Sequence, residues 1–217
     1  MASRTPFVVG IAGGSGSGKT SLACALAAAL GPRRVALLAH DAYYRDHGAL
    51  PPDARAALDF DAPEAFDQPL FRAHLRALRA GRAVRPPHYC FTTHRRLGPG
   101  DPVRPRHVLL VEGILLLHDP LVRAALDLAI FLDVPEAVRL ARRCARDVVE
   151  RGRTRESVLA QFAASVRPAH VRFVEPTKAH ADLVLAGTGS LDRLVEIATA
   201  VIRDRLARQA GPLALGA

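Results

Sequence analysis

An apolar run, a glycine-rich loop and an amphipathic pattern follow one another without a break near the start of the chain. Residues 7–12 are largely apolar, and residues 13–20 read Gly-Gly-Ser-Gly-Ser-Gly-Lys-Thr, which satisfies the phosphate-binding pattern G-x4-G-K-[ST]. Leucines recur at positions 22, 26 and 30 before Gly31-Pro32, as on one face of a helix that stops there. This order predicts a buried strand, a loop around a phosphate, and a helix whose N-terminus faces that phosphate.

The residue types of this loop fit nucleotide chemistry. Glycines let consecutive backbone N–H groups curl around a phosphate, a lysine reaches the β- and γ-phosphates, and a hydroxyl holds Mg²⁺. A chance match in a flexible loop is disfavoured, because a strand pattern precedes the loop and a helical pattern follows it. The residues expected to bind ATP are Gly13, Gly14, Ser15, Gly16, Ser17, Gly18, Lys19 and Thr20.

Four more apolar runs occupy residues 35–39, 108–111, 129–132 and 183–186. They do not alternate apolar with polar residues, which is typical of parallel strands covered by helices on both faces. Helical patterns lie between most of them, at 71–78 and 138–148, and a last one starts near Ser190. We therefore predict an α/β protein with the P-loop NTPase fold, a five-stranded parallel sheet flanked by helices. It would form a single domain at 1–210, followed by a flexible tail at 211–217.

Residues 82–105 break this alternation. They contain five prolines and two aromatic residues with little helical periodicity, so we predict strands or a loop that projects from the sheet. This segment is the best candidate for a small β-rich substrate lobe.

Composition excludes several classes of protein. The 217 residues and 49% hydrophobic content fit one folded domain rather than a disordered chain. Cys24, Cys90 and Cys144 are far apart without a CxxC pair, so neither a disulfide framework nor a zinc cluster is supported. No apolar run approaches the roughly 18 residues of a membrane span, and no signal peptide is recognisable, so we expect a cytoplasmic protein.

The net charge is +9, and all but two of the 30 basic residues are arginine. This charge alone would suit nucleic acid, an anionic membrane surface or a polyanionic small ligand. Arginines cluster between positions 139 and 155, where Arg139, Arg143 and Arg146 share one face of a predicted helix. For any single one of them, a solvated basic face is the competing interpretation.

Two carboxylates directly follow predicted strands. Glu112 follows the run at 108–111, as in a Walker B element, and Asp41 closely follows the run at 35–39. Ligands bind at the carboxyl ends of strands in open parallel sheets, so both should face the crevice beside the phosphate loop. We expect Thr20, Glu112 and Asp41 to hold or adjoin Mg²⁺, and Asp41 to accept a proton from a hydroxyl substrate. A solvent-exposed strand end for Glu112 and a turn position for Asp41 are the alternatives.

With these elements placed, the chain resembles the uridine kinase (uridine-cytidine kinase) family over nearly its whole length. The phosphate loop is common to many NTPases, whereas the remaining motifs together are specific. Those motifs are Asp41-Ala-Tyr-Tyr-Arg-Asp46, Phe60-Asp61-Ala-Pro-Glu-Ala-Phe-Asp67, Tyr89-Cys-Phe-Thr-Thr-His94-Arg-Arg96, Val111-Glu-Gly113, Arg142-Arg-Cys-Ala-Arg-Asp147, Arg151-Gly-Arg153, Gln161, and Glu175-Pro-Thr-Lys178 leading to Ala181-Asp182.

The resemblance implies roles for the groups around a substrate. Asp41 would be the general base for a nucleoside 5′-hydroxyl, and Asp61 with Arg143 would hold the ribose hydroxyls. Arginines of a lid at 139–168, above all Arg146 and Arg151, would neutralise the transferring phosphoryl group. The nucleoside-binding residues would be Asp41, Tyr44, Asp61, Tyr89, Phe91, His94, Arg143, Arg153 and Gln161. Without the resemblance, the aromatic residues would be interpreted as a packing cluster under a hairpin.

The resemblance further implies a kinase that transfers the γ-phosphoryl group of ATP or GTP to uridine or cytidine, giving UMP or CMP in pyrimidine salvage. It also implies Mg²⁺ dependence and a homo-oligomer, commonly a tetramer. His94 can donate or accept a hydrogen bond according to its tautomer, so both nucleosides are expected substrates. Cys90 stands where the family commonly has aspartate, which leaves the base preference open.

Two rival functions remain at this point. A sister kinase, such as a phosphoribulokinase or a pantothenate kinase, would act on another small alcohol, which the cluster of Tyr89, Phe91 and His94 disfavours. A nucleotide-gated RNA-binding regulator would use the +9 charge, but only 5% of residues are aromatic, so stacking platforms for bases are scarce. Neither nucleic acid nor a membrane is an expected partner. The loop at 187–189 is a candidate adenine contact, although two glycines more often mark a turn.

Overall fold

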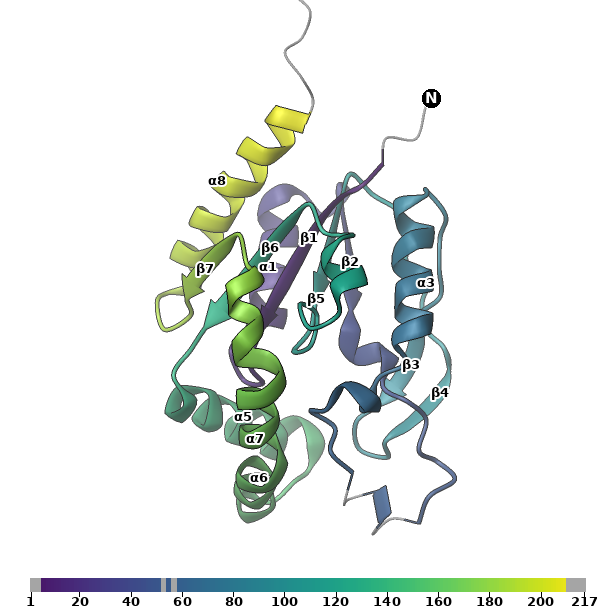
Figure 1. Ribbon diagram of the computed structural model, residues 1–217, viewed down its shortest axis with the longest axis vertical. Helices are drawn as coiled ribbons and strands as arrows, with labels where there is room; N and C mark the ends of the chain where they lie inside the picture. The colour runs from purple at the N-terminus through teal and green to yellow at the C-terminus, as the bar shows by residue number, and fades with distance from the viewer. Residues whose placement is uncertain (1–4, 52–53, 56–57, 210–217) are drawn as a thin grey trace, which may run out of the picture.

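The computed structural model describes residues 5–51, 54–55 and 58–209 (Figure 1). Five parallel strands form its main sheet in the order β2-β5-β1-β6-β7, which confirms the predicted five-stranded parallel sheet. The predicted tail at 211–217 lies outside the described residues. The strands are β1 (Phe7–Gly13), β2 (Val35–Ala39), β5 (Val108–Glu112), β6 (Leu128–Asp133) and β7 (Leu183–Ala186).

Strand β1 lies at the centre of the sheet and is buried at every position. Its successive side chains enter two separate apolar cores, because Val8 packs in one and Val9 in the other. Helices cover both faces, which is why the strands read as continuous apolar runs. The register of β1 with β5 pairs Ile11 with Glu112, so this carboxylate ends its strand beside the start of the phosphate loop.

Helices α1 (Lys19–Leu30) and α8 (Leu191–Gln209) pack against each other and cover one face of the sheet. Leu22 and Leu26 of α1 share a buried core with Ile202 of α8. The helix predicted from Leu22, Leu26 and Leu30 is therefore present, and its apolar face is the buried one. Ser190 caps α8 as predicted, because its Oγ accepts a hydrogen bond from Arg193 N at 3.3 Å.

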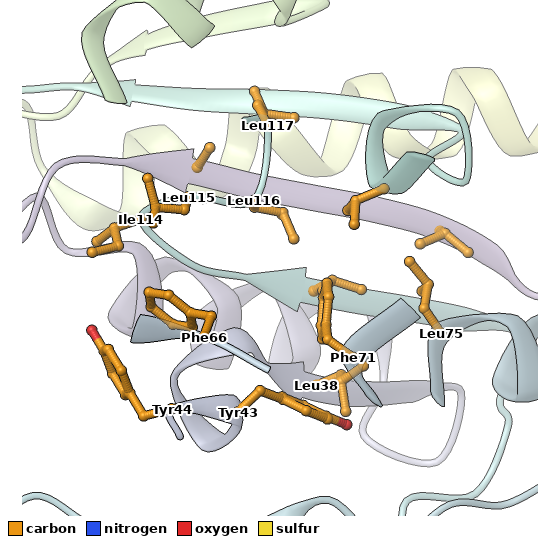
Figure 2. Close-up of a cluster of buried hydrophobic side chains, with 14 of the residues drawn as sticks. Leu38, Tyr43, Tyr44, Phe66, Phe71, Leu75, Ile114, Leu115, Leu116 and Leu117 are labelled. Atoms are coloured by element: carbon orange, nitrogen blue, oxygen red, sulfur yellow. The ribbon is translucent and has the colours of Figure 1, made fainter. Parts of the chain in front are cut away.

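Helix α3 (Gln68–Arg79) covers the opposite face. Asp67 caps it by accepting a hydrogen bond from Leu70 N at 3.2 Å, and a proline occupies its first turn. In Figure 2 the rings of Tyr43, Phe66 and Phe71 lie together beside the edge of the sheet, where they belong to a buried cluster. The short helices on this side are η1 (His40–Tyr43), η2 (Pro63–Ala65) and α4 (Pro120–Arg123).

Strands occur where the sequence predicted strands or a loop at 82–105. Strands β3 (Pro87–Cys90) and β4 (Arg95–Pro99) pair antiparallel, outside the main sheet. Arg96 fastens this hairpin to the body of the protein, because its Nε donates to Tyr44 O at 2.8 Å and its Nη1 pairs with Asp67 at 3.1 Å. The hairpin is thereby held beside the segment that follows β2.

A run of helices lies with the hairpin at the end of the molecule drawn at the bottom of Figure 1. Gly152, at φ +63°, ends α5, and Thr154 caps α6 by accepting from Ser157 N at 3.2 Å. The run comprises α5 (Glu136–Arg151), α6 (Arg155–Gln161), the π-helical segment η3 (Phe162–Val166), α7 (Arg167–Ala169), the π-helical segment η4 (His170–Val174) and η5 (Glu175–His180). The sequence did not predict the π segments, which are frequent near functional sites. No helix in the described part of the chain is long and apolar enough to cross a membrane.

Candidate active site

A cavity opens at the carboxyl ends of β2 and β5, between the phosphate loop, the hairpin and the helices α5 and α6. It holds about 700 Å³ of space that no protein atom fills, its open mouth included. The residues that line it are Ser15, Lys19, Thr20, Asp41, Tyr44, Phe60, Asp61, Tyr89, Phe91, His94, Glu112, Ile114, Arg143, Arg146, Arg151, Arg153 and Gln161. The structure thus brings together every residue that the sequence nominated for proton transfer, nucleoside binding and metal binding. The loop residues Gly13, Gly14, Gly16, Ser17 and Gly18 do not line this cavity.

The phosphate loop is a turn closed by its own backbone. Ser17 N donates to Gly14 O at 3.1 Å, and Gly16 has a φ of +80° that other residues rarely adopt. Gly18, at φ +96°, precedes α1, and no side chain among the described residues caps this helix. The first N–H groups of α1 therefore remain available to an anion, as a phosphate site at a helix N-terminus requires.

Lys19 is folded back over the loop. Its Nζ donates to Gly14 O at 3.1 Å, and the side chain is buried. Burial lowers the pKa of Lys19, while the nearby Glu112 and Asp41 oppose this shift. The carboxylates that adjoin the loop thus help to keep a cation at the position where a nucleotide phosphate would arrive.

Thr20 and Glu112 meet at the floor of the cavity. Thr20 Oγ1 donates to Glu112 Oε1 at 3.1 Å, and burial raises the pKa of Glu112, as does the neighbouring Asp41. Asp41 Oδ1 is buried and has no hydrogen-bond partner among the described residues. A hydroxyl and two carboxylates with unused lone pairs suit Mg²⁺, which keeps several waters and needs few protein ligands. The described residues form no cluster of three or more His, Cys, Asp or Glu that could hold a metal ion.

The segment after β2 is held in place by a buried imidazole. The ring of His40 stacks on Phe66 with centroids 4.3 Å apart, and burial lowers the pKa of His40 to about 4. A side chain at position 113 would meet His40 Cβ at 2.5 Å, so Gly113 is needed for the close approach of the two segments. This packing fixes Asp41, the next residue, beside Glu112.

Five rings line the outer part of the cavity, and we call Tyr44, Phe60, Tyr89, Phe91 and His94 the aromatic wall. Phe60 stacks on His94 with centroids 4.2 Å apart, and Tyr44 lies 5.2 Å from Tyr89. The hydroxyl of Tyr89 hydrogen bonds to His94 Nδ1 at 3.3 Å. Burial and the nearby arginines lower the pKa of His94, which favours the neutral ring. The wall is therefore a packed cluster that also presents a polar edge to the cavity.

Asp61 and Arg143 lie on the same cavity and connect its two sides. Burial raises the pKa of Asp61, and the Arg143 charge opposes that rise. Arg143 Nη1 donates to Ser15 Oγ at 2.7 Å, and its Nη2 donates to Gln161 Oε1 at 2.8 Å. Arg153 also donates to Gln161 Oε1, so the amide NH₂ of Gln161 is the group left to face a ligand.

One arginine expected in the lid has a different place. Arg139 is 3% exposed and does not line the cavity, because it packs against the back of the phosphate loop. Its Nε donates to Val134 O at 3.1 Å, and a side chain at Gly14 would meet its Nη1 at 2.7 Å. The shared helix face predicted a common role with Arg143 and Arg146, but Arg139 packs behind the loop, whereas Arg143 and Arg146 line the cavity.

The structure also places two further features that the sequence singled out, Cys90 and the loop at 187–189. Cys90 is half-buried and lies outside the cavity lining, and hydrogen bonds with Thr93 and Thr92 lower its pKa. The loop at 187–189 is tied to the phosphate loop by Arg142, whose Nη1 donates to Ser17 O at 3.2 Å and to Gly187 O at 3.1 Å.

Sequence reasoning assigned no role to Phe60, Ile114 and Asp147. The only sequence signal for Phe60 was its position before Asp61, and the only one for Ile114 was its position two residues after Glu112. Asp147 carried a clearer signal, because arginines surround it in the sequence at the spacings of one helix face. The structure places its carboxylate among the arginines that line the cavity.

Comparison with known proteins assigns the chain to a family. The family model described as "Phosphoribulokinase / Uridine kinase family" matches residues 8–192. Similar chains include a uridine kinase of Chloroflexus aurantiacus, 45% identical over 97% of this chain and 100% of the relative. Another is a uridine kinase of Deinococcus deserti, 43% identical over 93% of this chain and 97% of the relative. The solved structure of phosphoribulokinase from Rhodobacter spheroides superposes with a TM-score of 0.60 at 18% identity, over 86% of this chain and 74% of that one, and so shares the fold.

Proposed function

Because the chain belongs to the Phosphoribulokinase / Uridine kinase family, we propose that it is a uridine kinase. It transfers the γ-phosphoryl group of ATP or GTP to the 5′-hydroxyl of uridine or cytidine, giving UMP or CMP for pyrimidine salvage. The observation that carries this proposal is the cavity itself, which is lined by the phosphate loop, the aromatic wall and the polar side chains of Asp61 and Arg143. A kinase for a small alcohol without a base would have no use for five rings at this position.

Asp41 acts as the general base. Its buried Oδ1 has no hydrogen-bond partner among the described residues, so a lone pair is available to the substrate hydroxyl. The hydroxyl oxygen bonds to the γ-phosphorus as the bond from that phosphorus to the bridging oxygen breaks. The proton moves to Asp41, and ADP leaves with the electron pair of the broken bond. Lys19, Arg146 and Arg151 stabilise the charge on the phosphoryl oxygens.

Thr20 and Glu112 would be the protein ligands of Mg²⁺, with Asp41 adjacent. When bound, this ion offsets the charge of the β- and γ-phosphates and orients them for transfer. The hydrogen bond of 3.1 Å between Thr20 Oγ1 and Glu112 Oε1 supports the assignment, because it brings two oxygen ligands to one point.

The aromatic wall accepts the pyrimidine ring. His94 faces the edge of the base, and its tautomer suits either the uracil carbonyl or the cytosine amino group. Asp61 and Arg143 bind the ribose hydroxyls, which selects a ribonucleoside. Arg153 and the amide of Gln161 complete the nucleoside site.

At the level of the chain, residues 1–210 form one kinase domain. The segment 82–105 is its substrate lobe, and 139–168 is a lid that excludes water during transfer. In support of these roles, the hairpin and α5 both contribute side chains to the cavity. The enzyme works in the cytoplasm as a homo-oligomer, a tetramer by family resemblance.

The test is ADP release by the purified protein with ATP and Mg²⁺. Uridine, cytidine, thymidine, ribulose 5-phosphate, pantothenate and buffer are compared as acceptors. We expect turnover with uridine and cytidine alone. Turnover with ribulose 5-phosphate or pantothenate would favour a sister kinase. Tight, salt-sensitive RNA binding without nucleoside-stimulated turnover would favour a nucleotide-gated regulator.

A further inference from the structure

Asp147 is the one carboxylate without exposed surface among the residues that the structure describes. It lies on α5, and its carbonyl accepts the backbone N–H groups of Gly152 and Arg153 where that helix ends. The proposed chemistry of the cavity gives this residue no part. A buried charge destabilises the folded protein unless neighbouring groups compensate it, so the burial of Asp147 calls for an explanation.

Four arginines surround this carboxylate. Arg146 Nη2 lies 2.8 Å from Asp147 Oδ1, and Arg143 Nε lies 3.4 Å from Oδ2. Arg151 and Arg153 approach the two oxygens at 3.5 and 3.9 Å. All four guanidinium groups belong to residues that line the cavity. One anion therefore sits behind the cationic wall that faces a transferring phosphoryl group.

The four arginines depend on Asp147 to different degrees. Arg143 is also held by Ser15 and Gln161, and the guanidinium of Arg151 lies over the Phe91 ring at 4.4 Å. Arg153 has separate hydrogen bonds to Gln161 and to Ser157 O. Within the described residues, the guanidinium of Arg146 has no hydrogen bond or ion pair besides those to Asp147. A guanidinium has five N–H donors, so Arg146 keeps donors for a phosphate while Asp147 holds it.

We propose that Asp147 is a positioning residue for phosphoryl transfer, which holds Arg146 and, to a lesser extent, Arg151 where they meet the transferring group. This inference rests on the proposed kinase function. Without the carboxylate, like charges would separate the arginines, and Arg146 would have to be ordered during the reaction. An arginine that the folded protein already holds in place lowers the activation barrier for phosphoryl transfer. The entropy cost of ordering its side chain is then met on folding and not during the reaction.

A double-mutant cycle tests the inference. We compare kcat and KM of the wild type, Asp147→Asn, Arg146→Ala and the double variant, with uridine and ATP as substrates. We expect Asp147→Asn to lower kcat by about 10- to 100-fold, while KM for uridine changes by less than about 3-fold. The double variant should match Arg146→Ala within about 3-fold, because residues that act through one another are not additive. An Asp147→Asn enzyme with wild-type kcat, or effects that multiply in the double variant, would overturn the proposal.

Separate controls distinguish a loss of catalysis from a loss of folding. Asp204→Asn removes an exposed i,i+4 partner of Arg208 on α8, at 2.9 Å, and should leave both kcat and melting temperature near the wild type. Asp147→Asn is assayed well below its melting temperature, with its concentration of sites taken from nucleotide-binding stoichiometry. A merely structural role for Asp147 would lower the melting temperature but leave kcat per site and the additivity of the cycle unchanged.

Chemical rescue keeps the proposal testable even if Asp147→Asn does not fold. Guanidinium chloride at a non-denaturing concentration should raise the kcat of Arg146→Ala at least 10-fold, and the increase should saturate. The guanidinium ion can bind the Asp147 carboxylate in place of the missing side chain. A folded Arg146→Ala enzyme that shows no rescue would overturn the inference. A wild type that does not phosphorylate uridine or cytidine would overturn the proposed function, and the inference falls with it. An active wild type with an unaffected Asp147→Asn variant overturns the inference alone.

Discussion

The two sides of the cavity are built in opposite ways. The phosphate side comes from eight consecutive residues, 13–20, and works largely through backbone N–H groups and the start of one helix. The aromatic wall takes its five side chains from three separate segments of the chain, around Tyr44, Phe60 and the β3–β4 hairpin. A site made of backbone should tolerate few local changes, whereas a wall made of side chains can be adjusted one residue at a time.

The largest effect should come from the carboxylate between the two sides. Asp41→Asn removes the proton acceptor and should lower kcat about 10³-fold, with little change in KM for uridine or ATP. Steady-state kinetics with both substrates measures this. Asp46→Asn, in the same segment but outside the cavity lining, is the matched control and should stay near wild type. A loss below about 10-fold for Asp41→Asn would remove Asp41 as the base.

The phosphate side should lose activity when the backbone conformation of its loop is changed. Gly16→Ala places a Cβ against the carbonyl oxygen of Arg139 at a φ of +80°, so the loop must move. We expect kcat/KM for ATP to fall about 100-fold, while uridine binding, measured by calorimetry, stays nearly unchanged. Gly31→Ala, at φ +98° with only Arg34 Cδ at 3.8 Å and Cγ at 4.0 Å nearby, separates backbone strain from the clash. Equal losses in the two variants would contradict a loop-specific effect.

Acid should destabilise the segment after β2, where the imidazole of His40 is buried. The pKa of His40 is lowered by burial to about 4, from about 6.5 in an unfolded chain. Because the folded state disfavours the protonated ring, its contribution is complete above pH 6.5 and is lost as the pH falls toward 4. The expected loss is about 3 kcal/mol of unfolding free energy. Between pH 7.5 and pH 4.5, urea unfolding should show a larger fall in unfolding free energy for the wild type than for His40→Phe, and the difference should be about this size. Equal pH dependence of the two proteins would refute the role of His40.

The smallest effect should come from one group of the aromatic wall. Tyr89→Phe keeps the ring but removes the hydroxyl that hydrogen bonds to His94. A single hydrogen bond of this kind contributes about 0.5–1.5 kcal/mol, so kcat/KM for uridine should fall about 3- to 10-fold. KM for ATP should be unchanged, and the same kinetic assay measures both constants. A larger effect on ATP than on uridine would show that the two sides are not independent.

Much of the fold could be predicted because its signals are local. The five apolar runs match the five strands closely, and the first strand–loop–helix unit was expected where it occurs. Glycines at positive φ, Ser190 as a cap and leucines at helical spacing act within a few residues of one another. The phosphate loop could be predicted for the same reason. Four residues of the aromatic wall, Tyr44, Tyr89, Phe91 and His94, were assigned to the site only through the family resemblance, since nothing local marks Tyr44 and His94 as neighbours, and Phe60 was missed.

The sequence by itself determined the strands, the helices between them and the phosphate loop, because periodicity and backbone preferences depend on adjacent residues. Only the tertiary structure decided the strand order, the burial of Arg139 behind the loop, and the gathering of four arginines on Asp147. Arg139 and Arg143 share a helix face, yet Arg139 packs behind the phosphate loop, whereas Arg143 lines the cavity and bonds to Ser15. Which surface a side chain meets depends on packing between distant segments, and no pattern within a single helix contains that information.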